Sequence, residues 1–159
     1  MPSSAAAKRE AGLDLDRFLP YRLSVLSNRV SSAIARQYSD RFGLTIPEWR
    51  IMAVLGGAPG LSARDVAERT QMDKVQVSRA VESLMRARRV ARAADAADGR
   101  ILRLSLSPKG RAIYDEVVPL ALHLEDVFLS ALSPEERRQF DALLGKLARQ
   151  AHLLGGETK

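Results

Sequence analysis

Apolar residues recur every three or four positions near both ends of the chain, which predicts long amphipathic helices. The N-terminal stripe predicts one helix from about Asp16 to Phe42 and consists of Leu19, Leu23, Leu26, Val30, Ile34 and Tyr38. Toward the C-terminus, helices are expected from Lys109 to about Leu132 and from Pro134 onward, the latter with the stripe Phe140, Leu143, Leu144 and Leu147. Pro119 is expected to kink the helix that contains it.

Shorter helices in the middle of the chain are predicted by their capping residues. Thr45 with Glu48, and Ser62 with Asp65, have the spacing of capping boxes, and Asp73 can cap a further helix that runs to about Arg88. That last helix turns apolar residues inward (Val77, Val81 and Leu84) and leaves polar and basic ones outward (Lys74, Gln76, Ser78, Arg79, Ser83 and Arg86). A helix, a short turn and a polar, basic second helix are typical of the helix–turn–helix.

A β-hairpin is predicted immediately after the second helix of this pair. Residues 90–93 can form a short strand, residues 101–107 alternate between apolar and polar, and Asp98-Gly99 between them is a hairpin turn sequence. A hairpin in this position would form a wing. The predicted fold is therefore mainly α-helical, a winged helix–turn–helix with a small β-hairpin wing and long helices at both ends.

The positive charge of the chain lies in its middle third. Residues 64–111 hold twelve basic and six acidic side chains and so carry the entire net charge of +6, while the rest of the chain is neutral. A charge run is commonly only a solvated face. Because this basic segment coincides with the predicted helix–turn–helix and hairpin, it indicates a nucleic-acid-binding segment that is supported by the rest of the chain.

Composition excludes several classes of function. The chain has no cysteine, so disulfides, thiol redox sensing and cysteine metal sites are ruled out. His123 and His152 are the only histidines, and nothing in the sequence assembles a nucleophile with a base, so no enzyme, metal or cofactor is expected. The N-terminus has no apolar run of a signal peptide and no stretch is long enough to cross a bilayer, which leads us to expect a cytoplasmic protein.

Three segments resemble the MarR family of winged-helix regulators. Asp98-Gly99-Arg100, followed after five residues by Leu106-Ser107, is similar to the family's wing motif. Residues 44–50 (LTIPEWR) resemble its second helix and residues 73–84 (DKVQVSRAVESL) its recognition helix. Two positions depart from the family pattern: Gly99 replaces a frequent second arginine, and Arg89 replaces the glycine that usually ends the recognition helix.

The resemblance implies a homodimer in which the first helix and the last two helices interdigitate between subunits. The apolar stripes favour the same arrangement, because helices at the two ends of one chain lack sufficient partner surface and two-fold pairing is the commonest symmetry. Packing on their own subunit is the alternative. The expected parts are a disordered N-terminus (1–12), a dimerisation helix (13–44), a DNA-binding lobe (45–107) and C-terminal dimerisation helices (108–155).

The expected DNA contacts come from the helix–turn–helix and the wing. In the major groove they are Lys74, Gln76, Ser78 and Arg79; glutamine suits adenine and arginine suits guanine. Ser62 and Arg64 are expected to touch phosphate. Arg100 is expected at the minor groove, held by pairing with Asp98, and Arg92 and Arg103 are expected to meet phosphate.

The family is usually a repressor released by a small anionic or phenolic ligand. The segment 44–50, with Pro20-Tyr21-Arg22 before it, resembles the subgroup tied to catabolism of aromatic acids and aryl-CoA thioesters. The candidate ligand residues are Arg22, Ser24, Asn28, Arg29, Trp49 and Arg50. Arg22, Arg29 and Arg36 share one helix face, where they either bind an anion or form a solvated, salt-bridged stripe.

The sequence is compatible with three hypotheses about the function of the protein. The first is a homodimeric repressor that binds an inverted-repeat operator on double-stranded DNA and is released by an aromatic acid or its CoA thioester. The second is an architectural DNA-binding protein that responds to no ligand. The third is a regulator gated by a protein partner, and the sequence does not distinguish repression from activation.

Overall fold

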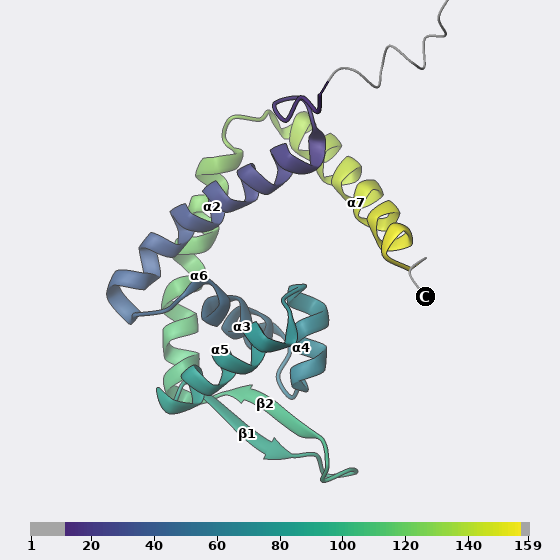
Figure 1. Cartoon of the computed structure of the whole chain (residues 1–159). Helices are drawn as coiled ribbons and strands as arrows, with labels where there is room; N and C mark the ends of the chain where they lie inside the picture. Colours follow the sequence, from purple (N-terminus) through teal and green to yellow (C-terminus); the bar gives the residue numbers. More distant parts are fainter. Residues whose placement is uncertain (1–11, 157–159) are drawn as a thin grey trace, which may run out of the picture. The chain divides into compact units, whose positions relative to one another are not determined.

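The computed structural model describes residues 12–156, so the predicted disordered segment 1–12 lies outside the described residues except for Gly12. In this range the chain forms six helices and one two-stranded antiparallel sheet (Figure 1). The contacts divide the chain into one unit that ends at Val118 and another that begins at Pro119. The elements in order are α2 (Leu19–Phe42), α3 (Ile46–Gly57), α4 (Ala63–Thr70), α5 (Lys74–Arg86), β1 (Val90–Ala94), β2 (Leu102–Leu106), α6 (Pro108–Leu129) and α7 (Pro134–Gly156).

The core of the first unit lies where α3, α4 and α5 pack together and against the sheet. Its members are supplied by every element from α2 to the first half of α6, and the least exposed include Ile51, Met52, Leu55, Val66, Leu84 and Val117. The predicted inward residues of α5 are all buried, and Ala80 joins them on the same face. Each of these elements therefore buries an apolar face in one shared core, as a lobe of this size requires.

Local capping explains where the middle helices begin. Thr45 and Ser62 each accept a hydrogen bond from the backbone N–H three residues on, and the acidic residue there returns one, so both predicted capping boxes are confirmed. Asp73 caps α5 by accepting from the N–H of Gln76 at 2.8 Å. Gln71, at φ 54°, makes the left-handed turn between α4 and α5. Each start satisfies backbone donors that the helix itself leaves unpaired.

The predicted wing is present as strands β1 and β2. Val90 pairs with Leu106 at one end of the ladder and Ala94 with Leu102 at the other. The loop between α3 and α4 adds a short bridge, in which Leu104 donates to the carbonyl of Leu61 at 2.8 Å. The base of the wing is thus hydrogen-bonded to the helix–turn–helix, while its tip extends away from it (Figure 1).

Some element boundaries differ from the sequence predictions. The first helix begins at Leu19 instead of Asp16, because residues 15–17 form a turn and Pro20 then occupies the first helical turn. The second strand begins at Leu102, since Ile101 closes the loop by donating to the carbonyl of Asp98 at 2.9 Å. Helix α6 ends at Leu129, earlier than the expected Leu132, and it continues as one helix through Pro119.

The second unit consists of the end of α6 and α7. A capping box of Ser133 and Glu136 begins α7, with bonds of 2.8 and 3.2 Å. Among its described residues none is buried, and the predicted stripe of α7 is exposed along its length. No single described helix is long and apolar enough to span a membrane; α6 and α7 pass that test only when joined across their break.

Candidate DNA-binding surface

Helix α5 has two faces of opposite character. Val77, Ala80, Val81 and Leu84 face the core, whereas the predicted contact residues Lys74, Gln76, Ser78 and Arg79 are all exposed. The helix therefore anchors itself on one side and presents polar and cationic groups on the other. This arrangement suits a helix that reads the edges of bases in a groove.

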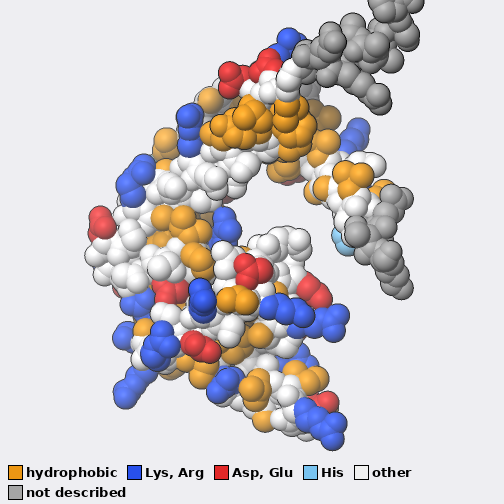
Figure 2. Space-filling model, in the orientation of Figure 1, with side chains coloured by type: hydrophobic (Ala, Val, Ile, Leu, Met, Phe, Trp, Pro, Cys, Tyr) orange, Lys and Arg blue, Asp and Glu red, His pale blue; other side chains and the backbone are white. Residues whose placement is uncertain are grey.

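Five cations on α5 and the wing have no ionic partner within the described part of the chain: Lys74, Arg79, Arg86, Arg92 and Arg100. Lys and Arg side chains gather over the lobe that carries α5 and the wing, including the tip of the wing (Figure 2). Arg64 is exposed as well, but it pairs with Glu68 one turn along α4, at 3.1 Å. Exposed pairs of this kind are weak and exchange readily for a phosphate.

The structure gives Arg103 a role inside the protein. Its guanidinium donates to Asp95 at 2.7 Å, lies 3.7 Å from Asp65 at the start of α4, and donates to the carbonyl of Gly60 at 3.4 Å. One side chain on β2 thereby ties the wing tip to the helix–turn–helix. We assign Arg103 to holding the wing in position, where the sequence led us to expect a phosphate contact.

Asp95 is a wing residue that the sequence analysis missed. Its carboxylate accepts hydrogen bonds from the backbone N–H of Asp98, from Arg103 and from the N–H of Ala97, and these bonds lower its pKa to about 2. The position of Asp95 at the start of a loop was visible in the sequence. Its partner, eight residues away, depends on the register of the hairpin.

Asp98 supports Arg100, but by a different contact from the predicted one. The Asp98 carboxylate accepts from the backbone N–H of Arg100 at 3.1 Å and forms no ion pair with its guanidinium. The bond shapes the turn at the wing tip and leaves the charged end of Arg100 free. The predicted pairing of these two side chains is therefore corrected to a side chain–backbone bond.

The C-terminus of α5 also differs from the sequence expectation. Arg88, at φ 57°, adopts the left-handed conformation, while Arg89 donates its N–H to the carbonyl of Leu84 at 2.8 Å. This is a Schellman turn with an arginine at the position that favours glycine. The residue of this turn whose conformation favours glycine is therefore Arg88, one residue before Arg89.

Arg89 connects the recognition helix to its neighbours. Its guanidinium donates to the carbonyl of Phe42 at the end of α2 and lies close to Glu48. Burial acts to raise the pKa of Glu48, but hydrogen bonds from Ser83 and Thr45 and the charge of Arg89 outweigh it and lower that pKa. Nothing local in the sequence shows that Phe42 and Glu48 lie beside Arg89.

Ser62 is likewise occupied within the protein. Its hydroxyl donates to the Asp65 carboxylate at 2.7 Å, and its backbone N–H donates to the same oxygen at 2.9 Å. These bonds lower the pKa of Asp65, with the Ser62 hydroxyl as the largest cause. Ser62 therefore sets the start of α4 and so the position of Arg64 beside it.

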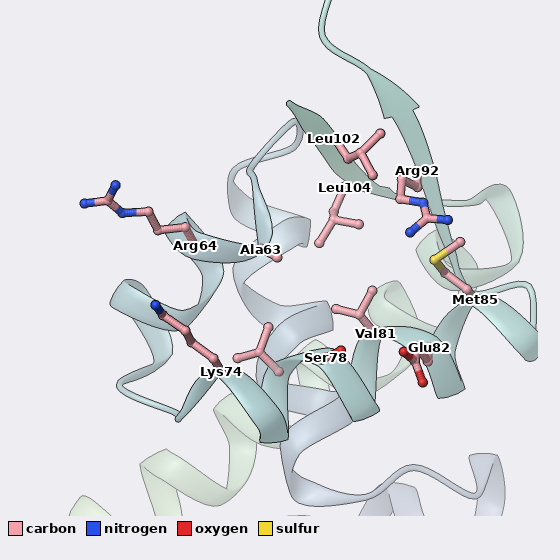
Figure 3. A pocket seen from close by; sticks show the side chains of 11 residues that line it. Ala63, Arg64, Lys74, Ser78, Val81, Glu82, Met85, Arg92, Leu102 and Leu104 are labelled. Carbon is pink, nitrogen blue, oxygen red and sulfur yellow. The ribbon is translucent and has the colours of Figure 1, made fainter. Parts of the chain in front are cut away.

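A hollow of about 340 Å³ separates α5 from the wing (Figure 3). Its floor is apolar and includes Val77, Val81 and Leu104, and its rim carries Lys74 and Arg92. In Figure 3 the Arg64 side chain points away from it.

The six candidate ligand residues do not form one site. Arg22 and Arg29 line a hollow of about 470 Å³ along the first half of α2, with apolar neighbours such as Leu19, Leu23 and Leu26. Ser24 and Asn28 lie outside that lining, on another face of the same helix. In α3, Arg50 is exposed, and Trp49 packs between two rings, 5.5 Å from Tyr38 and 6.0 Å from Tyr114.

A helix–turn–helix with a cationic second helix, followed directly by a hairpin wing, defines the class of winged-helix DNA-binding proteins. The sequence profile described as MarR family matches residues 42–101. The chain is 30% identical over 131 residues to the HTH-type transcriptional repressor Rv2887 of Mycobacterium tuberculosis, covering 82% of this chain and 91% of that protein. The chain belongs to the MarR family of DNA-binding transcriptional regulators, which are not enzymes.

Two solved structures extend this likeness. The MarR/EmrR family transcriptional regulator of Acinetobacter sp. ADP1 is 26% identical, with a TM-score of 0.81 over 89% of this chain and 99% of that one. The Bordetella bronchiseptica regulator BpsR, whose DNA binding is regulated by 6-hydroxynicotinic acid, is 25% identical, with a TM-score of 0.76 over 87% and 98% of the two chains. Both matches extend well beyond the residues that the family profile covers.

Proposed function

We propose that α5 enters the major groove of double-stranded DNA and that the wing tip follows the adjacent minor groove. The observation that carries this proposal is the set of unpaired cations on the exposed side of α5 and on the wing. In this proposal Gln76, Ser78 and Arg79 contact the edges of bases in the major groove, and Arg100 contacts the minor groove. Phosphate contacts are assigned to Arg64, Lys74 and Arg92, while Ser62, Asp98 and Arg103 hold these elements in place.

The functional unit in this proposal is a homodimer built from residues 13–44 and 108–155, with the DNA-binding lobe at 45–107. Its support is the exposed apolar stripe on both segments, which a second copy would cover. A two-fold dimer binds an inverted repeat whose half-sites lie about one helical turn, ~10 bp, apart. Binding at such an operator represses transcription by occupying the promoter.

The test is a mobility-shift titration of the full chain on DNA from upstream of its own gene, at fixed salt with non-specific competitor. Arg79→Ala is expected to cost about 1–3 kcal/mol and to relax sequence preference. Arg100→Ala is expected to weaken binding, and Arg69→Ala, an exposed arginine in the last turn of α4 with no assigned DNA contact, is the matched control. Equal affinity of Arg100→Ala and wild type would overturn the wing assignment, and a shift lost equally to any competitor would favour an architectural binder.

The proposed effector is a small aromatic acid or its CoA thioester, which releases the repressor in the cytoplasm. Arg22 and Arg29 beside apolar residues of α2 can pair with a carboxylate or a phosphate while the ring covers the apolar part. The regulation of BpsR by an aromatic acid supports this class of ligand. Bound there, the ligand needs only to favour a dimer whose two recognition helices no longer match the half-site spacing.

Thermal-shift measurements with benzoate, a hydroxycinnamate and benzoyl-CoA test this assignment. The stabilising probe is expected to lose its effect in Arg22→Ala and Arg29→Ala and to keep it in Arg36→Ala, which belongs to the same arginine row but lies outside the hollow. Loss of the shift in all three variants would indicate general charge attraction. No stabilisation by any probe would favour a regulator gated by a protein partner.

A further inference from the structure

The recognition helix carries one exposed hydrophobic side chain that folding does not explain. Val75 is 58% exposed, and between residues 27 and 100 no other large hydrophobic side chain is exposed. It lies two residues before Val77, which places it on the side of α5 opposite the buried face. Val75 therefore adds nothing to the core of the lobe.

The intrinsic preferences of valine argue against a role in helix stability. A β-branched side chain forms helix less readily than alanine, and an exposed one gains nothing from packing. Its flanks are exposed and cationic or polar, with Lys74 before it and Arg79 one turn later, neither of which has an ionic partner among the described residues. The surface around Val75 is therefore suited to a polyanion, and a protein or lipid partner would have to cover unpaired cations.

Within the major groove only one group of the bases is apolar, the C5-methyl of a pyrimidine. Because Val75 is on the first turn of α5, it lies at the end of a recognition helix that reaches base edges. We infer that Val75 reads a pyrimidine C5-methyl group, that of thymine or of 5-methylcytosine, at one position of each half-site. This inference rests on the proposed docking of α5 in the major groove.

The contact makes Val75 a determinant of specificity with a defined chemical partner. Gln76 and Arg79 would form hydrogen bonds with the edges of bases. Val75 would disfavour a base without a methyl group, because its own methyl groups would then contact water or a polar edge. Burying one methyl group is worth roughly a fourfold change in affinity. The effect is small enough to tune the choice of operator without controlling overall binding.

The experiment begins with selection of operators by the full chain from a random duplex library. Each thymine of the selected site is then replaced by deoxyuridine, which removes only the methyl group. We expect one position per half-site where wild type loses roughly fourfold in affinity. In the Val75→Ala variant the loss of affinity at that position should be close to onefold, which means no loss, while the losses at all other positions stay unchanged. Placing 5-methylcytosine in unmethylated cytosine positions shows whether that methyl is read as well.

Two further variants separate this inference from the docking on which it rests. Val75→Thr keeps one methyl group and should show an intermediate penalty at the same position, and both variants should fold because alanine and threonine are tolerated in helices. Arg79→Ala should change preference at a different base pair. If Arg79→Ala acts but Val75→Ala keeps the full uracil penalty, the methyl assignment is wrong; if neither changes any preference, the docking of α5 is wrong.

Discussion

The DNA-binding lobe is complete within one chain, whereas the helices at the two ends of the chain are not. Within residues 12–156, every buried hydrophobic residue lies between Tyr38 and Val117. Most exposed large hydrophobic side chains lie before residue 27 or after residue 121, on α2 and the turn before it, on the end of α6 and on α7. The lobe therefore buries its apolar residues by folding, and the terminal helices are left with apolar stripes that only another surface can cover.

The largest expected effect is on the uncovered stripe of α7. Leu144→Glu is expected to weaken dimerisation by at least about 100-fold, because a two-fold axis places two new carboxylates in the apolar interface. Sedimentation velocity across a concentration series measures it. Ala142→Glu, which adds the same charge to the opposite side of α7, is the control and should leave the dimer intact.

If the wild-type chain is monomeric at all concentrations, the conclusion that the terminal helices need a second copy is wrong, because their apolar stripes would then be stable without one. Equal weakening by Ala142→Glu would show that net charge, and not the apolar stripe, controls association. The winged lobe should keep its helical signal in both variants, because its core contains no residue of α7.

The second prediction compares one glycine in each region. A Cβ on Gly110 would lie 1.9 Å from the backbone oxygen of Arg89, whereas one on Gly145 of α7 would meet its nearest atom, on Arg149, at 3.6 Å. Gly110→Ala is therefore expected to lower the free energy of unfolding by about 2–3 kcal/mol. Gly145→Ala should raise it slightly, because alanine is the better helix former. Urea denaturation measures both, and equal effects would mean that the two regions are equally packed.

A smaller and stabilising effect is expected at the end of α5. Arg88→Gly removes the cost of a left-handed arginine and should raise the free energy of unfolding of the lobe by about 0.5–1 kcal/mol. Arg86→Gly, two residues earlier and at the last residue of the helix, should lower it by about 0.5–1 kcal/mol, because φ there is not left-handed. Urea denaturation again decides, and destabilisation by both glycines would argue against the Schellman turn.

The smallest predicted effect is a local pH dependence of the wing. The pKa of Asp95 is about 2, below the ordinary 3.8, so its bonds stabilise the wing loop above about pH 4 and are lost as the pH falls toward 2. NMR shifts of the Ala97 and Asp98 amides, which donate to Asp95, should follow that window. Asp95→Asn should abolish the titration, and amides that titrate unchanged in this variant would contradict the assignment.

Much of the fold followed from short-range patterns. Thr45, Ser62, Asp73 and Ser133 begin helices because their side chains bond to backbone groups three residues away, a distance that the sequence alone specifies. The inward face of α5 followed from helical periodicity, and the exposure of Lys74, Gln76, Ser78 and Arg79 followed from the same geometry. The DNA contacts themselves stay a prediction.

The differences between the expected and the observed contacts at the site have a common cause. Arg103 and Arg92 both precede a leucine or alanine on a strand of the same hairpin and look equivalent in the sequence, yet only Arg103 meets Asp95 and Asp65. Arg88 and Arg89 are adjacent, yet one is in the left-handed conformation and the other reaches Phe42. Whether a cation is free or bound within the protein depends on the presence of a partner group, and that partner can be as close as three or as distant as 47 residues along the chain.

The sequence by itself determined the order of helices and strands, the basic middle third and the amphipathic faces, because these depend on backbone capping, side-chain periodicity and charge along the chain. Only the tertiary structure decided which arginines are structural, that Trp49 packs between Tyr38 and Tyr114, and that Val75 has no partner in the lobe. These outcomes depend on how folded elements meet. Hydrogen bonds and burial between distant segments are set by packing, which no local pattern encodes.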